Sequence, residues 1–290
     1  MSSVETPTGP LHYTVCDIVP DWIESPQTII FHHGIAANTH IWAHWLPILA
    51  TRYRLVRFDM RGFGQSVVPA NDFAWSYDVL IGDLLAVAQA AGAARFHLVG
   101  ESIGGTAALA FSLKVPHKVL SLCLSNAAAR GGLVTNVKGW REIVEQGGQA
   151  AWAKQMMQWR FHPDALCPEL HAWYTRVHES CSMDATNALA DLLLASDLTP
   201  RLNEIKVPTL LLAPEASPFI PLDVMASMRA VVPGAELQVF AHSKHGLPLS
   251  HGRECAQVLQ EFLQRRFPQL PYPRGDPRSV GVGRGFGPGG

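Results

Sequence analysis

The sequence predicts an α/β protein in which helices cover a mostly parallel sheet. Short runs of apolar and β-branched residues alternate with longer segments of helical periodicity, a rhythm typical of parallel strands joined by helices. This rhythm stops after Ser125, and residues 130–203 carry only helical patterns before it resumes at Val207. A helical insertion between two sheet strands predicts a cap on an α/β core.

Six strands are expected from the apolar runs. They are Thr28–His32, Tyr53–Phe58, Phe96–Val99, Val119–Leu124, Pro208–Ala213 and Glu236–Phe240. Between the second and third of these, apolar residues from Val79 to Ala88 recur at helical spacing, which predicts a helix over Tyr77–Ala91. The expected organisation is therefore a core over residues 1–129 and 204–268, a helical cap over 130–203 and a flexible Gly/Pro-rich tail over 269–290.

Composition excludes several classes of protein. Apolar residues make up 48% of the 290 residues, which excludes a disordered chain, and 23 Lys and Arg against 24 Asp and Glu leave a net charge of −1. That balance gives no electrostatic footprint for nucleic acid or an anionic membrane. Residues 1–10 lack the features of a signal peptide, and the 5 cysteines show no metal-like spacing. We expect a reduced cytoplasmic protein without nucleic-acid or membrane partners; oligomeric state is left open.

The strongest motif is Gly-Glu-Ser-Ile-Gly-Gly at residues 100–105, between the strand Phe96–Val99 and a helix-prone segment. A nucleophile on a sharp strand-to-helix turn needs tiny neighbours two residues away on each side, which Gly100 and Gly104 supply. Ser102 is therefore the candidate nucleophile, at a helix N-terminus that favours a developing anion.

Two further elements complete an acyl-transfer site. The loop after the strand Thr28–His32 places Ile35 where it can offer a backbone N–H, and Ile103 follows the nucleophile. Two such donors form an oxyanion hole. His245, in the loop beyond the last strand, is the expected proton acceptor, while His242 and His251 are interpreted as polar surface residues.

These stretches together resemble the α/β-hydrolase family. The resemblance rests on residues 27–66, which contain His-His-Gly at 32–34 and Asp-Met-Arg-Gly-Phe-Gly-Gln-Ser at 59–66, on residues 100–105 and on Lys244-His245, and it extends to about residue 266. Residues 122–130 and the compact cap are similar to the 3-oxoadipate enol-lactonase and ring-cleavage hydrolase branch. The resemblance implies the α/β-hydrolase fold, with an eight-stranded, mostly parallel sheet, an inserted helical cap and an acyl-enzyme. It implies no cofactor or metal and only scaffold roles for Asp59 and Arg61.

The third catalytic group departs from the family pattern. Ser217 stands where the resemblance places an aspartate, and the loop after the preceding strand, residues 125–128, contains no acid either. Glu215, two residues upstream, is our candidate acid. The alternatives are an acid from elsewhere (Asp223, Asp191 or Asp197), a Ser-His dyad, a lone histidine or a chain that has lost hydrolysis.

The cap predicts the character of the substrate. Four tryptophans lie within it, of which Trp140 and Trp159 are our candidates for walls of an apolar pocket, although core packing is an alternative for both. Arg130 is a candidate partner for a substrate carboxylate, with a solvent-facing role as the alternative. The histidines of the cap and the pair His40 and His44 lack the spacing of a metal site.

The sequence thus predicts a serine hydrolase acting on a small carboxylic ester or lactone, with a small-molecule substrate that is apolar or carries a carboxylate. Hydrolysis of a carbon–carbon bond in a ring-fission product is the alternative on the same scaffold. Acyl transfer to another acceptor and cofactor-free perhydrolysis also fit. A ligand-binding protein built on a disabled hydrolase is the alternative from another class, because of the missing aspartate.

Overall fold

A sheet of eight strands forms the centre of the computed structural model, which describes residues 2–268. The strands lie in the order β1-β2-β4-β3-β5-β6-β7-β8, and all neighbouring pairs except β1–β2 and β2–β4 are parallel. Their bounds are β1 (Ser2–Val4), β2 (Leu11–Cys16), β3 (Thr28–His32), β4 (Arg54–Phe58), β5 (Phe96–Glu101), β6 (Val119–Ser125), β7 (Thr209–Pro214) and β8 (Glu236–Phe240). The predicted fold class is confirmed, whereas the predicted flexible tail, 269–290, lies outside the described residues.

The six predicted strands are present, each within two residues of its expected bounds at either end. The apolar runs do not reveal β1 and β2, which pair antiparallel at one edge of the sheet. Strands near an edge bury fewer of their side chains: Val15 of β2 is exposed, whereas every residue of β3 is buried. Such a strand carries a weaker apolar pattern.

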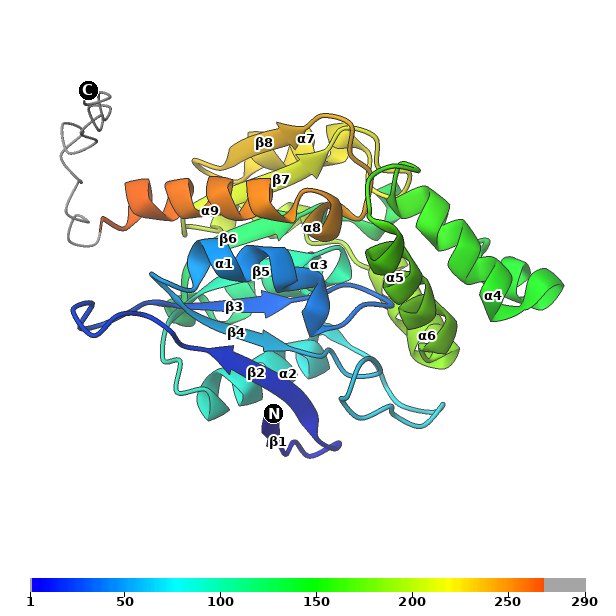
Figure 1. The fold of residues 1–290 in the computed structure, drawn as a ribbon, viewed down its shortest axis with the longest axis horizontal. Helices are drawn as coiled ribbons and strands as arrows, with labels where there is room; N and C mark the ends of the chain where they lie inside the picture. The colour runs from blue at the N-terminus through cyan, green and yellow to red at the C-terminus, as the bar shows by residue number, and fades with distance from the viewer. Residues whose placement is uncertain (1, 269–290) are drawn as a thin grey trace, which may run out of the picture.

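Helices cover both faces of the sheet, as Figure 1 shows. One face carries the 3₁₀ helix η1 (Thr39–Trp45), α1 (Leu46–Leu49) and α9 (Gly252–Arg266), and the other carries α2 (Tyr77–Ala90), α3 (Ile103–Lys114) and α7 (Leu222–Val231). The side chains of β3 alternate between the two layers. Ile29 and Phe31 join the core with α9, while Ile30 joins the core with α2 and α3. Both faces of the sheet are therefore buried, as is usual for a parallel sheet.

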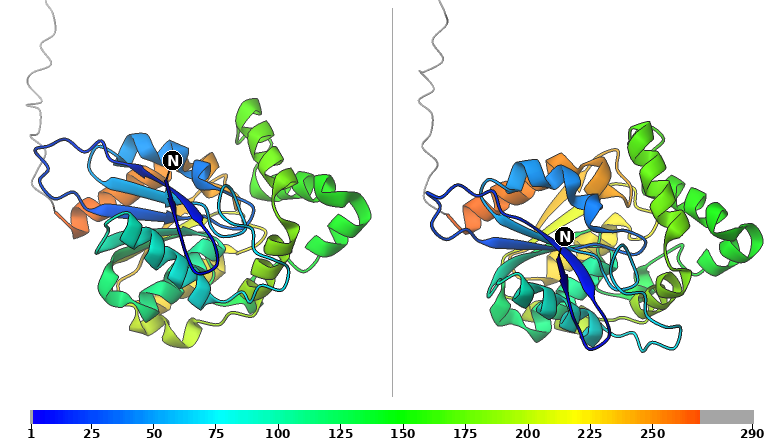
Figure 2. Two further views of the ribbon diagram at one scale, coloured as in Figure 1. Left: turned by 90° about the horizontal axis from the view of Figure 1, so that it is seen from below. Right: turned by 60° about the horizontal axis from the view of Figure 1, so that its bottom comes forward.

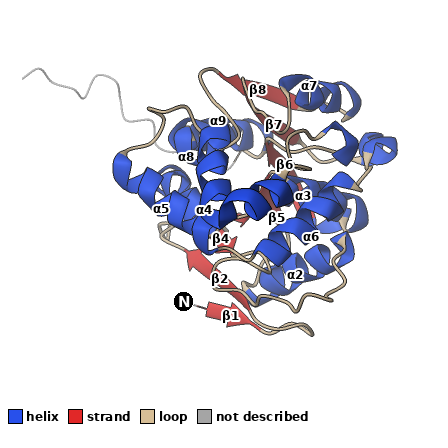
Figure 3. Ribbon diagram, turned by 90° about the vertical axis from the view of Figure 1, so that its right-hand side faces the viewer, coloured by secondary structure: helices blue, strands red, loops and turns tan. Residues whose placement is uncertain are grey.

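A third group of helices lies beyond the carboxyl ends of the parallel strands (Figures 1 and 2). It consists of α4 (Trp140–Arg160), α5 (Pro168–Ser180) and α6 (Met183–Leu194), and the end-on view of Figure 3 shows these helices in front of the sheet. An antiparallel β-bridge between Arg130 and Asp197 brings together the two ends of the segment 130–197, which contains these helices. The predicted domain limits at 130 and 203 stay a prediction.

The shorter elements connect these layers. They are η2 (Pro116–Lys118), η3 (Gly131–Leu133), η4 (Thr199–Glu204) and α8 (Leu247–Ser250). Helix α4 is interrupted at Gly148, whose φ of 75° is not helical. No helix within residues 2–268 is both long enough and apolar enough to cross a membrane.

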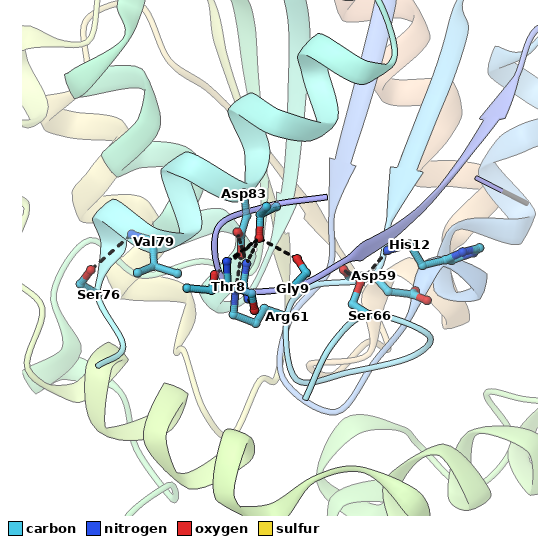
Figure 4. A network of polar contacts seen from close by, with 10 residues as sticks. Thr8, Gly9, His12, Asp59, Arg61, Ser66, Ser76, Val79 and Asp83 are labelled. Atoms are coloured by element: carbon cyan, nitrogen blue, oxygen red, sulfur yellow. Dashed lines mark hydrogen bonds and ion pairs between the residues drawn. The ribbon is translucent and has the colours of Figure 1, made fainter. Parts of the chain in front are cut away.

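A buried polar network fixes the loop after β4 (Figure 4). The guanidinium of Arg61 forms a two-pronged ion pair with Asp83 of α2, at 2.5 and 2.9 Å, and donates to the Thr8 carbonyl. The carboxylate of Asp59 accepts from the backbone N–H groups of Thr39 and Gln65. Both residues have their polar atoms occupied by the scaffold, which agrees with the structural roles that the resemblance implies for them.

Candidate active site

The chain changes direction across the sheet at β3. From this strand it passes first to β4 on one side, and it later enters β5 on the other side. Loops that leave neighbouring strands in opposite directions open a crevice at their carboxyl ends. The residues that follow β3 and β5, including Ile35 and Ser102, therefore lie at one place in the fold.

Ser102 lies on a strained turn between β5 and α3. Its φ of 55° and ψ of −126° lie outside the regions that L-residues normally occupy. The glycines around it permit this geometry: a Cβ on Gly100 would lie 2.5 Å from the carbonyl oxygen of Gly104, and one on Gly104 would collide with the carbonyls of His32 and His33. The tight packing holds the serine in this strained conformation.

His245 contacts this serine from the loop between β8 and α8. Its Nε2 lies 3.2 Å from Oγ of Ser102, and the residue is 2% exposed. Burial, together with the positive charge of Arg160, holds the pKa of His245 well below its usual value. The imidazole is therefore neutral near pH 7, which is the form that accepts a proton.

The other nitrogen of the imidazole meets Ser217. Oγ of Ser217 lies 3.3 Å from Nδ1 of His245, and it also accepts the backbone N–H groups of Phe219 and Ile220 at 3.3 and 3.2 Å. Ser217 takes the place of an aspartate in the sequence pattern, and in space it contacts the ring nitrogen that the acid of a catalytic triad contacts. A hydroxyl replaces a carboxylate there.

The structure does not bring Glu215 to His245. Its side chain is exposed, and Oε2 accepts the backbone N–H of His242 at 2.8 Å. The role predicted for Glu215 remains a prediction that this geometry does not support.

The alternative acids are engaged elsewhere. Asp191 pairs with Arg141, Asp197 pairs with Arg130, and Asp223 accepts the backbone N–H of Val224. The described structure gives none of these three carboxylates a contact with His245.

A different carboxylate lies at the site. Oε1 of Glu101 is 3.4 Å from Nε2 of His245 and 3.9 Å from Nη1 of Arg160, and the residue is 2% exposed. Burial raises the pKa of Glu101 to about 7, against the opposing effects of Arg160 and the N–H of Gly34. In the sequence, Glu101 is only the variable position of the motif. Its proximity to His245 depends on the turn that reverses the chain at Ser102.

The sequence motifs give no sign of Arg160 either, because it lies far from them along the chain. It ends helix α4, is 2% exposed, and donates from Nη2 to the carbonyl of Ile35 at 3.1 Å. Its guanidinium lies 5.9 Å above the ring of Tyr174 on α5. This side chain therefore joins the helices beyond the sheet to the loop after β3.

A small cavity borders Ser102 and His245. The centre of a water molecule can move through only about 10 Å³ of this cavity. That is room for about one water molecule. Its walls are mostly apolar and come from the sheet loops and from the segment that carries α4 to α6: Ile35, Val134, Val137, Trp140, Arg160, Leu193, Phe219 and Ile220.

The remaining predicted residues divide into two groups. Trp140 and Ile35 line the cavity, and the backbone N–H of Ile35 donates no hydrogen bond within residues 2–268. Ile103 begins α3 directly after Ser102. Trp159 instead packs against Phe219 with ring centres 5.6 Å apart. Arg130 is more than half exposed and lies 3.6 Å from Asp197. The structure thus brings Arg130 to a surface ion pair and not to the cavity.

Within residues 2–268, no three side chains of His, Cys, Asp or Glu are grouped so that they could hold a metal ion.

Known proteins match this chain over most of its length. Residues 27–251 match the family described as alpha/beta hydrolase fold. The chain is 26% identical to a 2-hydroxy-6-oxononadienedioate/2-hydroxy-6-oxononatrienedioate hydrolase of Escherichia coli, covering 88% of this chain and 91% of that protein. It is 23% identical to a putative carbamate hydrolase RutD of Caulobacter segnis, covering 86% and 96%.

Among solved structures, the enol-lactonase from Burkholderia xenovorans superimposes with a TM-score of 0.81. The two share 20% identity over 91% of this chain and all of the other, a likeness that shows the fold. An enol-lactonase and a 2-hydroxy-6-oxononadienedioate/2-hydroxy-6-oxononatrienedioate hydrolase are thus both among the similar proteins. The chain belongs to the alpha/beta hydrolase fold family and is an enzyme of that family.

Proposed function

We propose that this chain is a serine hydrolase that cleaves a small carboxylic ester or lactone through an acyl-enzyme. The observation that carries the proposal is the 3.2 Å contact between Oγ of Ser102 and Nε2 of His245, made on a strained strand-to-helix turn beside a cavity. A weak nucleophile needs such a neighbouring base, and a depressed histidine pKa keeps that base neutral.

In the proposed reaction, Oγ of Ser102 bonds to the substrate carbonyl carbon while its proton passes to Nε2 of His245. The backbone N–H groups of Ile35 and Ile103 hold the resulting oxyanion. The protonated His245 then gives its proton to the leaving oxygen, which leaves an ester on Ser102. A water molecule, deprotonated by His245, cleaves that ester and restores the enzyme.

The cavity walls indicate a compact, mostly apolar acyl group. Valine, leucine, isoleucine and aromatic side chains form most of the lining, with Trp140 among them. The free space admits only about one water molecule. We infer that residues 130–203 act as a cap that must move before substrate can reach Ser102.

Hydrolysis of a ring-fission acid at a carbon–carbon bond is a second candidate. It is favoured by Arg160, a buried cation in the cavity wall that can pair with a substrate carboxylate. The relative from Escherichia coli is named as a hydrolase of two dicarboxylates, 2-hydroxy-6-oxononadienedioate and 2-hydroxy-6-oxononatrienedioate.

Active-site labelling followed by a substrate panel tests these proposals. A fluorophosphonate is expected to label the wild-type protein and not Ser102→Ala, with Ser112→Ala as a matched control, since the Ser112 hydroxyl is bonded within α3. Esters, lactones and ring-fission acids are then compared by kcat/KM. Preference for a ring-fission acid selects the second candidate, and a wild-type protein that is neither labelled nor active contradicts both.

A further inference from the structure

Proton transfer from Ser102 creates a cation in an unfavourable place. His245 is buried, and the guanidinium of Arg160 already lies close enough to depress its pKa. The ionisable groups around this pair are Glu101 on β5 and, on the side of Arg160, Tyr174 and His178 of α5 and Cys181. A buried imidazolium needs a nearby negative charge.

Ser217 cannot provide that charge. When Nε2 accepts the proton of Ser102, Nδ1 carries its own hydrogen and must donate to Oγ of Ser217. That oxygen already accepts from Phe219 and Ile220. Three N–H donors then compete for two lone pairs, so the neutral hydroxyl stabilises the imidazolium weakly.

We propose that the Glu101 carboxylate, 3.4 Å from Nε2 of His245, supplies the negative charge that stabilises the imidazolium during acylation. This inference rests on the proposed function. The proton stays on Nε2 until the leaving oxygen takes it, and Glu101 exchanges no proton in the step. Its role is electrostatic, and it acts from the Nε2 side of the ring, whereas Ser217 contacts Nδ1.

The surroundings of Glu101 fit this role. Neither carboxylate oxygen makes a hydrogen bond of ordinary geometry to a side chain in the described residues. Arg160 is the neighbouring cation, at 3.9 Å, and the same Arg160 is anchored to the carbonyl of Ile35. Above pH 7, where Glu101 is mostly ionised, its charge is therefore incompletely neutralised by its surroundings and remains available when His245 accepts the proton.

The first test is Glu101→Gln, which keeps the size of the side chain and removes its charge. An adjacent opposite charge shifts a pKa by roughly 1–3 units, so the acylation rate is expected to fall about 10- to 1,000-fold. Glu179→Gln, the same change on an exposed position of α5, serves as the matched control. A Glu101→Gln protein that folds and acylates at the wild-type rate overturns the proposal.

The second test restores the charge from the other side of the ring. Ser217→Asp in the Glu101→Gln background is expected to recover acylation, because the new carboxylate lies against Nδ1. Failure of this rescue in a folded protein means that Glu101 acts otherwise, and it overturns the proposal. If Glu101→Gln does not fold, Ser217→Asp alone decides the matter. The acylation rate of the wild type is expected to rise through about pH 7, as Glu101 ionises. Ser217→Asp is expected to abolish this rise, and an unchanged rise contradicts the role of Glu101.

The third test does not depend on hydrolysis. The protonation of His245 is followed by NMR in Ser102→Ala, with and without Glu101→Gln. Because Glu101 has a pKa of about 7 and His245 a lower one, the two groups are expected to titrate as a coupled pair, and the His245 resonances should show a step near pH 7 that is lost in Glu101→Gln. The same His245 titration curve with and without Glu101→Gln overturns the proposal, whether or not the protein hydrolyses esters. Absence of fluorophosphonate labelling with a shifted His245 titration would instead reject the proposed function and retain the electrostatic coupling.

Discussion

Oγ of Ser217 lies 3.3 Å from Nδ1 of His245, on the other side of the imidazole from Ser102. This contact has the geometry of a catalytic triad without the charge of its acid. Glu215, two residues earlier in the same loop, is directed instead toward the backbone of His242. The loop therefore orients the histidine but contributes no carboxylate to it.

Glu215→Gln is accordingly expected to retain hydrolysis to within about twofold, the scale of an exposed substitution. The reason is that its carboxylate is exposed and accepts the His242 N–H, and it has no contact with His245 in the described residues. The measurement is kcat/KM for this variant and for Glu101→Gln, which make the same chemical change at two acids near one site. A large loss for Glu215→Gln would restore the acid that the sequence predicted.

The rate of ester hydrolysis is expected to rise with pH through about pH 7. Glu101 has a pKa of about 7, so its carboxylate is mostly neutral at pH 5 and mostly charged at pH 9. His245 has a depressed pKa and is already neutral over this range. The measurement is kcat/KM between pH 5 and 9. A midpoint that stays in place in Glu101→Gln would contradict this assignment.

The contribution of Glu101 to stability is expected to change with pH in the opposite direction. The folded state holds the proton of Glu101 up to about pH 7, whereas an unfolded glutamate loses it near pH 4.5. Between these values the folded state binds more protons at this group, so its contribution to the free energy of unfolding falls as pH rises, by about 3 kcal/mol. Buried histidines with lowered pKa values, His245 among them, contribute with the opposite sign. The measurement is therefore the difference in the free energy of urea unfolding between the wild type and Glu101→Gln, at pH 5 and at pH 8. This difference should change by about that amount, whereas the difference between the wild type and Glu179→Gln should stay constant.

Arg160→Gln is expected to raise the pKa of both Glu101 and His245, because it removes the cation that lowers each of them. The midpoint of the pH profile should therefore move upward. Arg130→Gln, an exposed residue paired with Asp197, is the control and should leave the midpoint unchanged. A midpoint that moves in Arg130→Gln and not in Arg160→Gln would support the substrate-binding role that the sequence predicted for Arg130.

Gly104→Ala is expected to destabilise the protein by about 1–3 kcal/mol, the usual effect of forcing an extra group into a packed interior. Its Cβ would meet the backbone carbonyls of His32 and His33, which cannot move aside. Gly82→Ala on α2 meets nothing within 4 Å and should instead stabilise the helix by about 0.5–1 kcal/mol. Thermal unfolding of the two variants checks both signs.

The sequence is sufficient for features that depend on local pattern. Buried parallel strands are continuous apolar runs, so the predicted bounds of β3 are the observed ones, and Gly100 and Gly104 mark the turn that carries Ser102. Strand β2, the second from the edge of the sheet, has a half-exposed pattern, and its position depends on pairing with β4, about 40 residues away. Such a pairing has no local signal.

The charged residues of the site could not be predicted from the sequence, for a similar reason. Glu101 and Arg160 are 59 positions apart and meet only because α4 ends over the loop after β3. Glu215 is predicted from its closeness along the chain to Ser217, whereas the direction of its side chain is set by the His242 backbone. Proximity in sequence does not predict direction in space.

The one-water volume of the cavity has a kinetic consequence. If the cap proposed for residues 130–203 must move before a substrate reaches Ser102, catalysis cannot run faster than that movement. If the motion limits turnover, kcat should decrease with solvent viscosity while the chemical step remains unaffected. The frequency of opening would then set the upper limit of turnover for every substrate, whatever the reactivity of its carbonyl group.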